Sequence, residues 1–170
     1  EESKEEPTKN IPDPTVTDID GYIYRIVKIG SQTWMGENLN TIHYNDGTPI
    51  PGNLSDFEWE TTTTGAYAIF GSPDIYGKLY NGYAVLTGKL CPAGWHIATH
   101  DEWLTLENYL GGSAVAGGKL KYTELWEKPN PATNSSGFSA LGAGMRQTTG
   151  FYTGLNFTIL FWTQDKTVPL

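Results

Sequence analysis

Residues 18–39 read DIDGYIYRIVKIGSQTWMGENL, and two turn signals divide this stretch into segments of alternating character. The dipeptides DG (20–21) and GS (30–31) are typical of turns. Between them, aromatic and β-branched residues alternate along the chain with the two-residue period of a strand. Residues 32–35 return after the second turn. The stretch therefore predicts a β-hairpin at the start of the folded domain.

A helix is predicted near 100–110. Thr99 and Glu102 have the spacing of a capping box, in which the threonine hydroxyl accepts from a backbone N–H while the glutamate reaches back to the Thr99 amide. The GG pair at 111–112 is a typical helix end. One face of this helix is apolar and carries Trp103, Leu106 and Leu110.

The rest of the chain is read mainly as ordered loop. Residues 53–78 and 111–156 are rich in glycine and polar residues, whereas FTILFWT (157–163) is an apolar run that predicts a core strand. Together these segments predict one α+β domain over 18–170, with small antiparallel sheets, one or two helices and long ordered loops.

The charge of the chain restricts its partners. The net charge is −8 and the pI about 4.7. A nucleic-acid partner is not expected, because such proteins carry a basic stripe. No apolar run approaches the roughly 20 residues of a membrane-spanning helix. The acidic, proline-bearing residues 1–17 predict a disordered tether, exposed after a targeting segment is removed.

His96, His100 and Cys91 are the candidates for metal binding or catalysis. His96 and His100 have the four-residue spacing of helical metal ligands, but the capping box starts the helix at Thr99, so the two lie on different elements. We therefore expect no metal and no cofactor, with His96 a partly buried residue beside Trp95. Cys91 is the only cysteine, and we interpret it as a buried structural thiol.

Aromatic side chains in the loops are the remaining candidates for ligand binding. Each ring either anchors its loop or forms an exposed platform that stacks on the face of a sugar. Phe151 lies beside Tyr152 in one such loop. The candidate ligand-binding residues are Trp59, Tyr122, Trp126, Arg146 and Tyr152.

Several blocks of the sequence, in this order, resemble one known family. They are the hairpin stretch 18–39, YNDGTPI, YGKLYNGYAV, GKLCPAGWHIATHDEWLTLENYLGG, VAGGKLK and TNSSGFSALGAGMR. The chain is similar to the Fibrobacter succinogenes major paralogous domain over about 18–163. It departs from the family pattern where Ala98 replaces a usual proline and Gly82 a usual tryptophan.

The resemblance implies a fold and a location. It implies a C-type-lectin-like fold, related to the formylglycine-generating and sulfatase-modifying domains, in secreted proteins or outer-membrane lipoproteins of Bacteroidetes and Fibrobacter. A lipid anchor upstream of residue 1 is expected on the same ground. Family members continue into further strands and a terminal cysteine, so Cys91 resembles half of a disulfide whose partner would lie beyond Leu170.

Three functions remain open. The first is a non-catalytic surface domain that binds glycan or another surface molecule. The second is an oxidoreductase of the formylglycine-generating type, although a single cysteine cannot supply the copper site of those enzymes. The third is a structural domain in a surface assembly, whose open C-terminal edge is completed by a partner protein.

Overall fold

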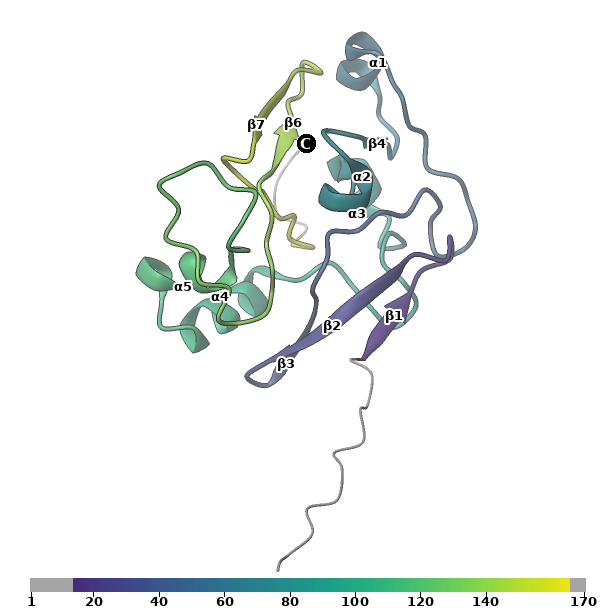
Figure 1. The fold of residues 1–170 in the computed structure, drawn as a ribbon. Helices are drawn as coiled ribbons and strands as arrows, with labels where there is room; N and C mark the ends of the chain where they lie inside the picture. Colours follow the sequence, from purple (N-terminus) through teal and green to yellow (C-terminus); the bar gives the residue numbers. More distant parts are fainter. Residues whose placement is uncertain (1–13, 166–170) are drawn as a thin grey trace, which may run out of the picture.

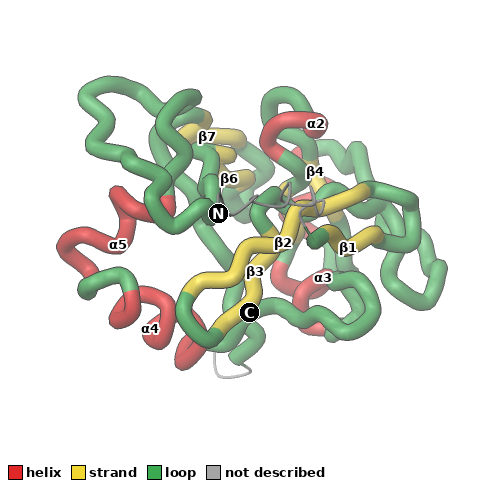
Figure 2. The backbone as a smooth tube through the Cα atoms, turned by 60° about the horizontal axis from the view of Figure 1, so that its bottom comes forward, coloured by secondary structure: helices red, strands yellow, loops and turns green. Residues whose placement is uncertain are grey.

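The computed structural model describes residues 14–165, and it shows a mixed α/β domain with small antiparallel sheets and a few short helices (Figure 1). Loops, green in Figure 2, make up much of the backbone between these elements. Residues 1–13, the larger part of the predicted tether, lie outside the described residues. Within the described residues, no helix has the length and apolarity needed to cross a membrane.

The predicted hairpin is confirmed and forms the centre of a three-stranded sheet. Strand β2 (Ile23–Ile29) pairs with β3 (Gln32–Met35) in antiparallel register, with Ile29 opposite Gln32. Gly30 occupies the turn at φ 60°, a conformation that favours glycine.

The third strand corrects the boundary of the predicted tether. β1 (Thr15–Thr17) pairs antiparallel with β2, with Thr17 opposite Ile23. Threonine and valine have high strand propensity, and the free edge of β2 gives them a strand to pair with. The composition of residues 1–17 indicated disorder because it does not show that this edge lies nearby. The described domain therefore begins before Asp18.

The remaining strands form two separate pairs. β4 (Tyr67–Ala68) pairs with β5 (Leu79–Tyr80), and β6 (Ala143–Arg146) pairs with β7 (Tyr152–Leu155), both antiparallel. The sequence pattern around β4, β6 and β7 indicated ordered loop, because glycine and polar residues hide these short strands, whereas the pattern around β5 was ambiguous.

The expected helix is present with its complete capping box. α4 (His100–Tyr109) begins after Thr99, whose hydroxyl accepts from the Glu102 N–H at 3.2 Å. The Glu102 carboxylate accepts from the Thr99 N–H at 2.7 Å. That backbone hydrogen bond is the largest influence holding the pKa of Glu102 below its ordinary value.

The prediction of one or two helices is wrong, because the described residues contain five. The longest of the unexpected helices is α5 (Ser113–Leu120), which includes Gly117 and Gly118. Their low helix propensity hid it in the sequence, but Ala116 is buried against Leu106 of α4 and tertiary packing compensates. The others are α1 (Asp56–Thr61), α2 (Pro73–Tyr76) and α3 (Gly82–Leu86).

The buried apolar residues form three clusters. The first joins β2, α4 and α5 through Ile29, Leu106 and Ala116, with Trp103 packed against it. The second surrounds Tyr80 and the helix α3, and a third, smaller cluster surrounds Trp59. Each cluster pins a long loop to the body of the domain, which explains why a chain with so little regular structure is compact.

The predicted core strand at 157–163 is absent. This segment forms one isolated bridge, between Ile159 and Gly144, and leaves the Leu160 side chain 63% exposed. A turn at Gly154 precedes it, since the Thr158 N–H donates to the Gly154 carbonyl at 3.0 Å. Phe161 instead stacks on Trp103, with ring centres 4.9 Å apart. The apolar run follows the surface of the core and joins no sheet.

Candidate functional site

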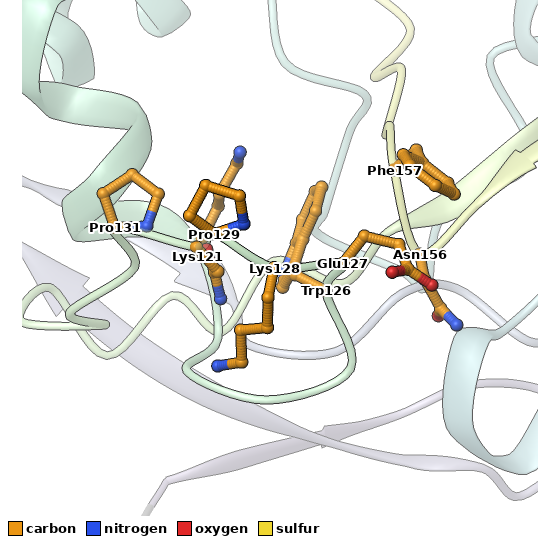
Figure 3. A pocket seen from close by; sticks show the side chains of 9 residues that line it. Lys121, Trp126, Glu127, Lys128, Pro129, Pro131, Asn156 and Phe157 are labelled. Atoms are coloured by element: carbon orange, nitrogen blue, oxygen red, sulfur yellow. The ribbon is translucent and has the colours of Figure 1, made fainter.

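A hollow of about 290 Å³ lies between the 121–131 loop and the turn at 156–157, and we call it the Trp126 hollow (Figure 3). In Figure 3, Pro129 and Pro131 lie on one side of the Trp126 ring, and Asn156 and Phe157 lie on the other. Its lining combines aromatic, charged and amide side chains, a combination suited to small polar ligands.

Trp126 forms the floor of this hollow and is no exposed platform. Its side chain is only 7% exposed, and its indole N–H donates to the Ala140 carbonyl at 3.1 Å. The Lys121 ammonium group lies 4.3 Å from the centre of the ring. The exposed ring is Phe157, at 69%. Sequence reasoning missed Phe157 because it assigned that residue to a core strand.

Two lysines, Lys121 and Lys128, line the hollow. Among the described residues, neither Lys121 nor Lys128 makes an ion pair, whereas Lys89 pairs with Asp46 at 2.8 Å. Glu127 also lines the hollow, but its carboxylate lies on the Asn156 side and the Lys128 ammonium group on the other (Figure 3).

The turn opposite the loop is held by hydrogen bonds. The Asn156 side chain accepts from the Tyr76 hydroxyl at 2.7 Å, and its carbonyl accepts from the Glu127 N–H at 2.9 Å. Asn156 has φ 64°, which asparagine tolerates better than most residues. This bonding fixes the distance between the two walls of the Trp126 hollow.

Tyr122 lines a second, larger hollow of about 540 Å³. Arg25 lies in its wall, where it donates to the Gly137 carbonyl at 3.0 Å and pairs with Glu37 at 3.3 Å. Leu125, at φ 61°, belongs to the same wall. The 121–131 loop thus contributes Tyr122 and Trp126 to two different hollows.

The other three candidates, Trp59, Arg146 and Tyr152, lie together away from both hollows, and we call this cluster the Arg146 clamp. The Arg146 guanidinium carbon lies 4.5 Å from the centre of the Trp59 ring and 4.9 Å from that of Tyr152. Arg146 donates to the carbonyls of Leu54 and Gly150, each at 2.9 Å, and its side chain is 3% exposed. These bonds tie the loop before α1 to the β6–β7 hairpin. Arg146 and Trp59 are buried and anchor these loops, whereas the Tyr152 ring remains 39% exposed.

His96, His100 and Cys91 lie in different surroundings. His96 is exposed and not partly buried as expected, because it lies in the loop before α4 and its Nε2 reaches the Glu102 carboxylate at 3.0 Å near the surface. His100 is exposed in the first turn of α4. Cys91 is 7% exposed, and burial raises the pKa of its thiol to about 11. A thiol with that pKa is almost wholly protonated at neutral pH, so it is a poor nucleophile.

A comparison with family models assigns the chain to a known family. The family model of the Fibrobacter succinogenes major domain matches residues 27–169. The chain belongs to this family. No curated protein and no solved structure matches it.

Three further residues of this Fibrobacter major domain complete the candidate site, and they were not predicted from the sequence. Lys121 ends the block VAGGKLK, which indicates the family but no binding role, Lys128 has no motif around it, and Asn156 resembles many other loop asparagines. Their proximity depends on how the 121–131 loop faces the 156–157 turn, and that contact joins residues far apart in the chain. Only the clustering of Tyr122 and Trp126 in one loop gave a local signal.

Proposed function

We propose that this domain is a non-catalytic carbohydrate-binding domain and that the Trp126 hollow binds a sugar carrying an acidic group. The observation that carries this proposal is that one hollow is lined both by the exposed Phe157 ring and by two lysines that have no acidic partner among the described residues. An aromatic face packs against the C–H groups of a pyranose ring. The lysines attract a carboxylate or sulfate on the same sugar.

The charge of the whole protein makes this local arrangement informative. With a net charge of −8, most of the surface repels an anionic ligand, so affinity has to come from a local positive site. Asn130 and Asn156 also line the hollow. Their Oδ1 atoms accept from the Ala132 N–H at 3.2 Å and from the Tyr76 hydroxyl at 2.7 Å, and each oxygen keeps a second lone pair for a sugar hydroxyl.

The family resemblance supports a fold and a location for this function. We include in the proposal a C-type-lectin-like fold and a place on the cell surface, either as a lipoprotein or as a secreted protein. Protease treatment of intact cells that make the native protein tests the location. Digestion before lysis is expected for a surface protein, and protection until lysis would contradict that location.

The oxidoreductase alternative has less support. The copper site of the formylglycine-generating type uses cysteine thiolates, whereas the single cysteine of this chain is buried and the pKa of its thiol is raised to about 11. Copper titration of the purified domain distinguishes the two functions, because only the enzyme is expected to bind copper through Cys91.

A glycan array followed by calorimetry tests sugar binding. We expect uronate-containing or sulfated oligosaccharides to bind better than neutral oligosaccharides of equal length. Phe157→Ala should weaken binding by about three- to tenfold. Lys121→Ala and Lys128→Ala should each weaken it by about two- to fivefold and reduce its dependence on salt.

Matched variants control for general surface effects. Phe57 is 73% exposed in α1 and Lys28 is exposed in β2, and neither lines a hollow. Phe57→Ala and Lys28→Ala should leave binding unchanged. Equal binding of neutral and acidic sugars, or equal losses in the control variants, would contradict the assignment of the Trp126 hollow.

A further inference from the structure

Lys78 is a buried lysine in an aromatic environment, and neither hollow uses it. Lys78 directly precedes β5 in the chain, and it is only 9% exposed. The Nζ atom lies 5.2 Å from the centre of the Tyr22 ring and 5.6 Å from that of Tyr67. A lysine at such a position is unusual, because removing an ammonium group from water is costly unless an acid pairs with it.

No carboxylate within the described residues is close enough to form an ion pair with Lys78. Burial is the largest influence on this amine and lowers its pKa, although the charges of Asp20, Asp18 and Asp74 act in the opposite direction. Burial thus increases the fraction of uncharged amine, the nucleophilic form of lysine.

Both hydrogen-bond acceptors of Lys78 belong to one residue, Asn40. Nζ lies 2.6 Å from the Asn40 carbonyl oxygen and also contacts Oδ1 of its side-chain amide. Asn40 is itself only 7% exposed. The amine of the lysine and the carboxamide of the asparagine are therefore in direct contact in a site that largely excludes water.

The surrounding backbone holds this contact in place. The Lys78 N–H donates to the Leu39 carbonyl at 2.9 Å, so the two segments are already joined beside the side chains. The Asn40 N–H donates to the Tyr24 hydroxyl at 3.0 Å, and that hydroxyl donates to Asp18 at 2.5 Å. Fixed contact of this kind converts a slow condensation between separate molecules into an intramolecular step.

We propose that Lys78 and Asn40 condense into an intramolecular amide cross-link. The Nζ lone pair forms a bond to Cγ of Asn40, and the bond from Cγ to Nδ2 breaks. One proton of the amine passes to the departing nitrogen, which leaves as ammonia. The product is a secondary amide between the two side chains. The atoms balance without an oxidant, a cofactor or any other reactant.

The cross-link would close the segment from 40 to 78 into a covalent loop. That loop contains α1, β4 and α2, which are short elements connected by long irregular chain. A covalent bond at its base limits how far this region can open, and it converts a buried charge into a neutral amide. The inference does not depend on sugar binding, since neither residue lines either hollow.

Intact mass spectrometry of the purified full-length chain tests the proposal. The mass should be lower than that of the sequence by one molecule of ammonia. Digestion should yield one branched peptide that contains both Asn40 and Lys78, and trypsin should not cleave after Lys78. A full sequence mass in natively folded protein, with trypsin cleaving after Lys78 once the chain is unfolded, would overturn the proposal.

Variants distinguish the cross-link from succinimide formation at Asn40, which also releases ammonia. Lys78→Arg should restore the full mass if the two side chains are linked, and so should Asn40→Ala. Lys89→Arg, which changes an exposed lysine that pairs with Asp46, should retain the loss of ammonia. Persistence of the loss in Lys78→Arg would contradict the link. The branched peptide of the unaltered protein decides the matter if a variant fails to fold.

Discussion

At the scale of single residues, Arg146 shows how a side chain that looked available for ligands is committed to structure. Its guanidinium lies between the rings of Trp59 and Tyr152 while its N–H groups reach the Leu54 and Gly150 carbonyls. Lysine carries the same charge but has neither the planar stacking surface nor the forked donors. A lysine at position 146 therefore cannot make the same contacts, although it carries the same charge.

We expect Arg146→Lys to lower the free energy of unfolding by about 2 kcal/mol, because buried carbonyl acceptors lose their donors. Urea denaturation measures the change. Lys128→Arg, which alters an exposed lysine of the 121–131 loop, serves as the control and should change stability by less than about 0.5 kcal/mol. Equal stability of Arg146→Lys and the wild-type protein would show that the Arg146 clamp contributes little.

The buried thiol of Cys91 predicts a dependence of stability on pH. Burial raises its pKa from 9.0 to about 11, so the folded state keeps the proton at pH values where the unfolded chain releases it. Its contribution is fully present below pH 9 and is lost as the pH rises from about 9 to about 11. The loss is of the order of 3 kcal/mol.

Comparison with Cys91→Ala isolates that contribution, because the tyrosines and lysines titrate in both proteins. Stability should fall more steeply between pH 9 and pH 11 in the wild-type protein than in the variant. Parallel curves would rule out a raised thiol pKa. Thiol labelling of the native protein should likewise be slow at neutral pH and fast after unfolding.

At the scale of elements, α4 begins where its capping box dictates. Thr99→Ala removes the acceptor for the Glu102 N–H and should cost about 1 kcal/mol in urea denaturation. Thr105→Ala, at an exposed position inside the same helix, is the matched control and should cost less or even stabilise. A similar effect of both substitutions would mean that the cap has no special role.

The elements also show which parts of the fold can be predicted from sequence. α4 and the β2–β3 hairpin were predictable because their signals, a capping box and turn dipeptides, act over a few residues. α5 was not, since Gly117 and Gly118 argue locally against a helix that packing against α4 stabilises. The prediction of a core strand at 157–163 was wrong for the opposite reason. An apolar run indicates burial in a sheet, but a strand forms only where the fold places a neighbouring strand beside it.

The candidate site was predictable only in fragments. Trp126 was chosen for its ring and its loop, and it does line a hollow, but as the floor and not as the exposed platform. Phe157, Lys121 and Lys128 were missed, because their meeting depends on the fold of two loops about 30 residues apart. Loop-rich domains place function in such long-range contacts, where local pattern carries little information.

At the scale of the whole molecule, the proposed link between Asn40 and Lys78 should change the unfolded state most. A chain closed between these residues remains more compact when denatured, so it exposes less surface on unfolding. The chain-entropy model assigns about 4 kcal/mol of stabilisation to a closed loop of this length.

We therefore expect guanidinium denaturation of the wild-type protein to show a smaller m-value and a higher midpoint than that of Lys78→Arg. The comparison of m-values is informative even if the substitution also disturbs packing, since packing in the native state alters the midpoint more than the slope. Size measurements in concentrated guanidinium give an independent readout, and the linked chain should be the smaller one. Identical slopes and identical denatured dimensions would mean that no covalent bond joins the two segments, and that Lys78 is retained as a buried amine by its contacts with Asn40 and the two tyrosine rings.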